Sequence, residues 1–129
     1  MSWHNTALIL AGVIGSGTAV VHGVLTQRLM VKPIEAALVA NGRINGPIRR
    51  LVPLLLHMST VVWFLGGLAL IAAAQWAGED LRLWTGLFVG SLLLYGAVGN
   101  FWGTRGRHPG WMLLAAAIAL IGYGVSQGG

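Results

Sequence analysis

Three of the four histidines in this 129-residue chain lie within or beside long apolar runs. They are His22 in VVHGVLTQRL, His57 in LLLHMSTVVW and His108 in RGRHPGW. A neutral imidazole binds zinc, copper, iron and haem, and it also donates or accepts hydrogen bonds. Ionisable side chains are costly inside apolar membrane helices, so each one marks a candidate functional site by default. The histidines therefore direct attention to the helices that would position them.

The composition predicts that those helices cross a membrane. The chain is 56% hydrophobic and only 9% charged, with a mean hydropathy of +0.75. A bilayer core of about 30 Å needs about 20 helical residues, and about 17 is the lower limit. Four apolar runs meet this limit, and they predict helices at residues 6–25, 51–74, 83–99 and 109–125. The expected fold is all-α, an integral membrane four-helix bundle forming a single domain over residues 1–129.

The positions of the eight basic residues predict the orientation of this bundle. Seven lie in the two segments that would share one side of the membrane, and only Arg82 lies on the other side. Since short cytoplasmic loops are enriched in Lys and Arg, both termini are expected outside the cytoplasm. The net charge of +5 thus indicates topology, and no nucleic-acid partner is expected. The seven basic residues are Arg28, Lys32, Arg43, Arg49, Arg50, Arg105 and Arg107, and the expected cytoplasmic-side membrane anchors are Arg49, Arg50, Arg105, Arg107, Trp102 and Trp111.

The first cytoplasmic loop, residues 26–50, is expected to contain a short interfacial helix. In KPIEAALVANGR, Pro33 can occupy the first turn and Asn41-Gly42 can end the helix. Its apolar residues, Ile34, Leu38 and Val39, are expected to lie along the membrane surface.

Pairs of small residues four positions apart are expected to bring the helices into close contact. In lipid, helices associate through such packing, because there is no hydrophobic driving force between them. The pairs are Gly12 and Ser16, Gly86 and Gly90, and Ala115 and Ala119.

The predicted topology brings His22, His57 and His108 to the cytoplasmic end of the bundle. His22 would lie about 5 Å and His57 about 9 Å inside the membrane boundary, at 1.5 Å per residue. The three are therefore candidate ligands for haem or a transition metal, with Gln27 or Glu35 as a possible additional ligand. A structural role is the alternative, since histidines near helix ends also hydrogen-bond to neighbouring backbone or to headgroups. Asn100, Ser59 and Thr60 are other polar groups expected on this side.

No residue pattern predicts a catalytic site. No serine, histidine and acid are spaced as a nucleophile would require, and no carboxylate pair indicates acid–base hydrolysis. The chain also lacks a phosphate-binding glycine pattern. Enzyme activity is therefore not expected.

The stretches around His22, His57 and His108 resemble an uncharacterised family of small four-helix bacterial inner-membrane proteins. The resemblance covers nearly the whole chain and implies a multi-pass protein of the bacterial inner membrane. Members of that family tend to carry an acid where this chain has Gln27 and an aromatic where it has Leu56. If the acid is a metal ligand in the family, the amide here weakens the case for a metal.

Two classes of function fit these features. The favoured one is a non-enzymatic accessory or structural subunit that packs against a membrane-protein partner or forms a homo-oligomer. The alternative is a haem-, metal- or quinone-binding protein that uses the cytoplasmic-side histidines. A small transporter or channel is a weaker alternative, because helix one lacks the glutamate of small multidrug transporters and the fluoride-channel signatures are not evident.

Overall fold

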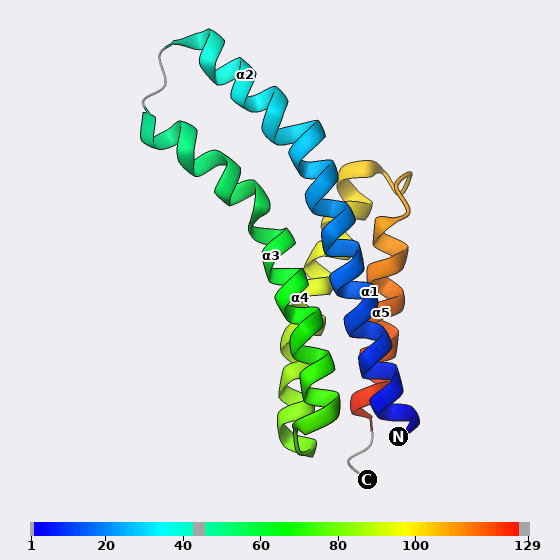
Figure 1. Ribbon diagram of the computed structural model, residues 1–129. Helices are drawn as coiled ribbons and strands as arrows, with labels where there is room; N and C mark the ends of the chain where they lie inside the picture. Colours follow the sequence, from blue (N-terminus) through cyan, green and yellow to red (C-terminus); the bar gives the residue numbers. More distant parts are fainter. Residues whose placement is uncertain (1, 43–45, 127–129) are drawn as a thin grey trace.

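The computed structural model describes residues 2–42 and 46–126, and within them the fold is helical without strands. A π-helical segment, η1, joins the first two α-helices into one continuous rod (Figure 1). The elements are α1 (Trp3–Thr26), η1 (Gln27–Val31), α2 (Lys32–Asn41), α3 (Gly46–Trp76), α4 (Glu79–Thr104) and α5 (Gly110–Val125).

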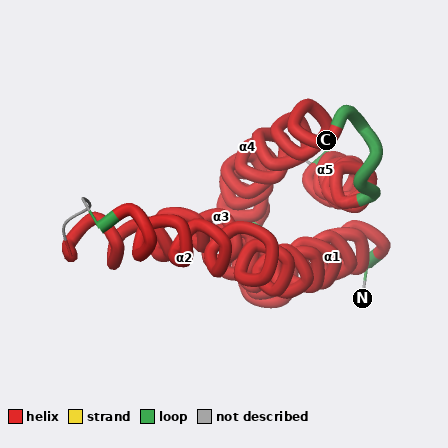
Figure 2. Tube along the Cα trace, turned by 90° about the horizontal axis from the view of Figure 1, so that it is seen from above, coloured by secondary structure: helices red, strands yellow, loops and turns green. Residues whose placement is uncertain are grey.

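Four of these helices form a closed ring of contacts. α1 packs against α3 and α5, and α4 packs against the same two helices. Viewed from above, α4, α5 and α1 surround the bundle axis, while α2 and the first part of α3 run off to one side (Figure 2). The core is made of one or more buried residues from each of the four helices, and its fully buried leucines are Leu8, Leu70, Leu93 and Leu114.

Glycines set the distance between α1 and α3. A Cβ added to Gly12 would lie 2.5 Å from the Gly67 carbonyl oxygen, so the two backbones touch. Ser16 adds a hydrogen bond by donating its hydroxyl to the Phe64 carbonyl at 3.1 Å. The prediction of close packing at Gly12 and Ser16 is confirmed, as expected where small residues let helices approach.

The corresponding predictions for the later helices have mixed outcomes. Gly86 packs closely on Val125 and Ile121 of α5, so close packing is confirmed there, whereas Gly90 makes only ordinary contact. The prediction for Ala115 and Ala119 is wrong, because both are exposed. Hydropathy is nearly uniform around α5, so the packed face could not be distinguished by apolarity alone; that face instead carries Gly110, Leu114, Ala117, Ile121 and Gly124.

Three helical rods are long and apolar enough to cross a membrane: residues 3–41, 46–76 and 79–104. The fourth, α5, is apolar but shorter, with 16 residues. These three rods extend beyond the apolar runs that predicted them, whereas α5 does not. The rod over residues 3–41 has 39 residues and spans about 58 Å at 1.5 Å per residue, well over a bilayer core of about 30 Å.

The segment expected as a loop is instead a helical hairpin, which we call the arm (residues 28–41 and 46–56). The predicted helix and its stop at Asn41-Gly42 are present, and Gly42 takes a left-handed conformation with φ 61°. The expectation that this helix lies within a loop is wrong, because η1 carries the chain from α1 into α2 without a break. Arg43 lies outside the described residues. The arm bends away from the bundle (Figure 1).

Two backbone irregularities accompany this bend. In η1 the Lys32 N–H bonds to the Gln27 carbonyl, five residues back, in place of the usual four. In α3, Pro53 lies inside the helix and has no N–H to give to the Arg49 carbonyl. Sharp helix bends are usually found at prolines and π turns, so each leg of the arm has a local cause for leaving the bundle axis.

The two ends of the bundle differ in charge. At one end, where α1 begins, His4 Nδ1 lies 2.9 Å from the Tyr123 carbonyl near the end of α5, and the acidic pair Glu79 and Asp80 starts α4. The other end carries the α4–α5 turn with Arg105 and Arg107, and the arm with Arg28, Lys32, Arg49 and Arg50 (Figure 1). We call this second end the basic end.

Candidate functional site

The RGRHPGW stretch forms the tight turn between α4 and α5. Arg105 ends α4 in the left-handed conformation at φ 53°, and Gly106 follows at φ 73°. The Gly106 N–H donates to the Phe101 carbonyl at 2.8 Å, which satisfies one of the free carbonyls at the end of α4. α5 begins at Gly110, with Pro109 as its cap, one residue later than predicted.

Trp111 holds this turn against α4. Its indole N–H donates to the Gly106 carbonyl at 3.2 Å, and its ring meets Phe101 edge-on with centroids 5.2 Å apart. Trp102, by contrast, is 82% exposed, as a side chain at a membrane boundary would be. Trp111 therefore has a local structural role in the turn, and its role as a membrane anchor stays a prediction.

His108 is fixed by the same turn. The Gly110 N–H donates to His108 Nδ1 at 3.1 Å, so the neutral ring carries its proton on Nε2. The His108 backbone N–H points to the Thr104 hydroxyl at 3.4 Å, and that hydroxyl donates to the Asn100 carbonyl at 2.7 Å. The arrangement leaves Nε2–H of His108 as a donor toward other groups.

His22 is held inside the bundle by α1 and α3. Its Nε2 lies 3.1 Å from the Ser59 hydroxyl and 3.3 Å from the Thr26 hydroxyl. Its ring also packs on Trp63, with centroids 4.7 Å apart. Ser59 thus proves to be a partner of His22, whereas Thr60 is not.

His22 and His108 line one cavity of about 230 Å³ near the basic end. Two of the residues that line it, Thr18 and Asn100, each have a side-chain oxygen that is buried and has no hydrogen-bond partner among the described residues. Buried polar atoms are nearly always paired, and an unpaired one costs about 1–3 kcal/mol, so both side chains favour a further hydrogen bond. The polar and aromatic side chains lining the cavity are Thr18, His22, Trp63, Asn100 and His108.

The cavity is mostly apolar and is lined by residues that face outward. Val21 on α1 and Leu113 on α5 both line it, and they are 58% and 49% exposed. Because α1 and α5 pack side by side, these residues mark an opening between the two helices. If the bundle lies in a bilayer, the opening faces lipid.

His57 does not line this cavity. Its Nε2–H donates to the Gln27 side-chain oxygen at 2.8 Å, and it lines a separate hollow with Arg28, Lys32 and Thr60. Glu35 lies further out, in the groove of the arm. Among the described residues, no group of three or more His, Asp or Glu side chains is placed to hold a metal ion.

Sequence reasoning overlooked two of the cavity residues, Thr18 and Trp63. Thr18 precedes His22 by four positions, so the helical repeat places both on one face of α1. Trp63 is the tryptophan in the middle of an apolar run, whereas others fall near predicted membrane boundaries. Both signals were present in the sequence.

In comparisons with protein-family models, curated proteins and solved structures, the chain matches none of them. The resemblance to a bacterial inner-membrane family therefore stays a prediction.

Proposed function

We propose that this chain is a small integral membrane protein that binds a lipid-soluble ring compound bearing carbonyl or hydroxyl oxygens, such as a quinone head group. The observation that carries the proposal is that Thr18 and Asn100, two residues lining the cavity of His22 and His108, each have a buried side-chain oxygen without a partner. Ligand sites of this kind combine an apolar lining with a few convergent polar groups.

The available hydrogen-bond donors favour such a ligand. His108 offers Nε2–H, Thr18 offers its hydroxyl proton, and Asn100 offers an amide group. A quinone carbonyl accepts these donors, and a quinol hydroxyl donates to the Asn100 oxygen. Trp63 supplies an aromatic wall on which a flat ring can stack. The opening between Val21 and Leu113 suits entry from a bilayer.

Haem or a transition metal fits less well. The cavity, at about 230 Å³, is smaller than the roughly 300–1,000 Å³ of sites for drug-sized ligands. Metal ligation needs an imidazole lone pair, and the lone pair on His108 Nδ1 already accepts from Gly110. The lone pair of His57 is free on Nδ1, but His57 lines a separate hollow. Metal or haem binding stays a prediction.

Binding of a short-chain quinone to the purified protein in nanodiscs tests the proposal. Quenching of tryptophan fluorescence reports binding near Trp63. We expect Asn100→Leu and Thr18→Val each to weaken binding about five- to tenfold, because each removes one hydrogen bond worth about 1 kcal/mol. Thr60→Val is the matched control, since it deletes an equally unpartnered hydroxyl outside the cavity.

Saturable quenching that Asn100→Leu weakens and Thr60→Val leaves unchanged would support the site. Quenching that all three variants share equally reports partitioning into lipid and would overturn it. An absorption spectrum and metal analysis of the same sample test the haem and metal alternatives.

We also propose that the basic end faces the cytoplasm of a bacterial inner membrane, with both termini outside. The gathering of Arg28, Lys32, Arg49, Arg50, Arg105 and Arg107 at one end supports this orientation. A reporter fused after residue 129 tests it. A fusion active only in the cytoplasm contradicts the proposal.

A second candidate function is that of an accessory subunit or homo-oligomer, and the outer face of α4 favours it. Gly99 and Gly103, four residues apart, have no atom within 4 Å of an added Cβ. This is the spacing at which membrane helices associate, and the chain leaves it uncovered. Cross-linking in membranes, with Gly99→Leu and Gly103→Leu as disrupting variants and Gly122→Leu as the control, tests this role.

A further inference from the structure

The two legs of the arm are held together at their base and stand apart above it. His57 on α3 donates to Gln27 of η1, and α3 contacts η1, but α3 makes little contact with α2 beyond that point. The gap is a groove of about 580 Å³, lined by Glu35 and Val39 on α2 and by Gly46, Arg49, Arg50 and Pro53 on α3. It lies well apart from the cavity of His22 and His108.

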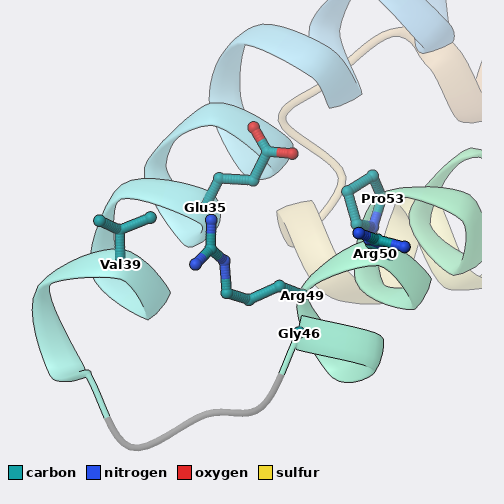
Figure 3. A pocket seen from close by; sticks show the side chains of 6 residues that line it. All are labelled: Glu35, Val39, Gly46, Arg49, Arg50 and Pro53. Atoms are coloured by element: carbon teal, nitrogen blue, oxygen red, sulfur yellow. The ribbon is translucent and has the colours of Figure 1, made fainter.

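The α3 wall of the groove is basic, and the α2 wall carries a carboxylate, Glu35. Figure 3 shows the Arg49 side chain reaching from α3 toward Glu35 on α2, while Arg50 lies beside Pro53. Below it, Lys32 and Arg28 line the hollow around His57. Glu35 is the one carboxylate among the arm residues, so these four cations leave the arm with a net charge of +3.

Apart from Val31 at its base, no side chain of the arm is buried. No residue of α2 is buried, and residues 46–51 of α3 are all exposed. Large apolar side chains are exposed on both legs beside the cations, namely Leu29, Met30, Val39, Ile48, Leu51, Leu54 and Leu55. Apolar and cationic side chains mixed on exposed helices are typical of a segment lying at the headgroup level of a membrane.

We propose that this groove binds a phosphate group carried by an anionic lipid, with Arg49 and Arg50 as the principal contacts. Arginine presents a planar set of donors that matches phosphate oxygens, and two of them on successive residues supply the charge for one phosphate. The apolar side chains around the groove then contact the acyl chains of the same lipid. Glu35 opposes the bound anion and limits the affinity.

Titration of lipids into the full-length protein, followed by native mass spectrometry, tests the proposal. We expect one anionic lipid to bind more tightly than a zwitterionic lipid of the same acyl chains. Arg49→Gln and Arg50→Gln should each weaken it about fivefold, as one cation near a phosphate does. Glu35→Gln should tighten it. Arg82→Gln, which removes a cation at the other end of the bundle, is the matched control and should change nothing.

A parallel titration with inorganic phosphate identifies the source of the phosphate group. If phosphate alone binds with the same dependence on Arg49 and Arg50, the site is upheld but its ligand is a solute and not a lipid. Equal binding of anionic and zwitterionic lipids would overturn the proposal. So would anionic-lipid binding that Arg49→Gln and Arg50→Gln leave unchanged, because the contact would then lie elsewhere. Both arginines are exposed, so folding should tolerate these variants.

Discussion

The same two helical rods pack tightly in the bundle and stand apart in the arm. Between Gly12 and Gly67 their backbones touch, whereas beyond the Gln27–His57 bond no residue of α2 is buried. Side-chain size and charge account for the difference. Glycine and serine line the contact in the bundle, whereas arginine and lysine line the hollow around His57, and arginine and glutamate line the groove above it. The two rods thus stay together where small residues line their contact and separate where long charged side chains begin.

The largest difference in unfolding free energy between the bundle and the arm should come from truncating one leucine in each. Leu114 is fully buried in the bundle, and Leu54 in the arm is 68% exposed. Leu114→Ala leaves a cavity and should cost about 2–5 kcal/mol of unfolding free energy. Leu54→Ala should cost less than about 0.5 kcal/mol. Unfolding in mixed micelles by added SDS measures both, and equal losses would contradict the distinction between a packed bundle and an unpacked arm.

Adding a methyl group should give a smaller difference between the bundle and the arm in the loss of unfolding free energy. A Cβ at Gly67 would lie 2.5 Å from the Gly12 carbonyl oxygen and 2.8 Å from the Ser16 nitrogen, both backbone atoms. Gly67→Ala should therefore force α1 and α3 apart at a cost of about 1–3 kcal/mol. Gly46→Ala meets no atom within 4 Å and should cost nothing. The same unfolding assay decides, and a harmless Gly67→Ala would show that the two helices are not packed as described.

The bond at the base of the arm should be worth somewhat less. Gln27→Leu leaves the His57 Nε2–H without its partner and should cost about 1–2 kcal/mol. Gln75→Leu, at an exposed position of α3, is the control. A double-mutant cycle with His57→Leu isolates the coupling energy between the two side chains. A coupling energy near zero would show that this bond does not hold the two legs of the arm together.

The smallest effects are expected from the unpartnered hydroxyls. Thr18 Oγ1 in the bundle cavity and Thr60 Oγ1 near the base of the arm are both buried without a partner. In protein purified without ligand, Thr18→Val and Thr60→Val should each leave stability unchanged or raise it by up to about 1 kcal/mol. Added quinone should stabilise wild type and Thr60→Val more than Thr18→Val in a thermal assay. Equal stabilisation of wild type, Thr60→Val and Thr18→Val would show that Thr18 does not contact the ligand.

The spans were predictable from the sequence, while the arm was not. Apolar runs at residues 6–25 and 51–74 mark where a helix is compatible with lipid, but they do not mark where the helix ends. The apolar run ends at residue 25 because Gln27, Arg28 and Lys32 lower the hydropathy. These residues do not interrupt the helical backbone, so the end of the apolar run predicts a loop where the helix in fact continues. The stop at Asn41-Gly42 was predictable because it depends on local backbone conformation.

The candidate site was predictable in part. Apolar runs gave the depth of His22 and His108 along their helices, and both do line one cavity. The apolar runs do not predict the direction in which each imidazole ring points. That direction depends on the order of the helices around the bundle and on local hydrogen bonds. His57 differs from the others for this reason, since its partner Gln27 lies on another side of α1. The unpartnered atoms of Thr18 and Asn100 arise from packing among four helices, which no spacing in the chain encodes.

The π segment has a consequence for the phase of the long rod over residues 3–41. In an uninterrupted α-helix, Gln27 would share its face with Ile34 and Leu38, seven and eleven positions later. The one additional residue in the π turn advances that frame by one position, and the groove is lined by Glu35 and Val39. If the same residues formed a regular α-helix, the frame would turn by about 100° and bring Ile34 into the groove in place of the carboxylate. A deletion of one residue within 28–31 removes the additional residue together with the π turn, so Glu35 and Val39 should keep their place in the groove. The π turn, and not the apolar pattern, thus decides which side chains line the groove.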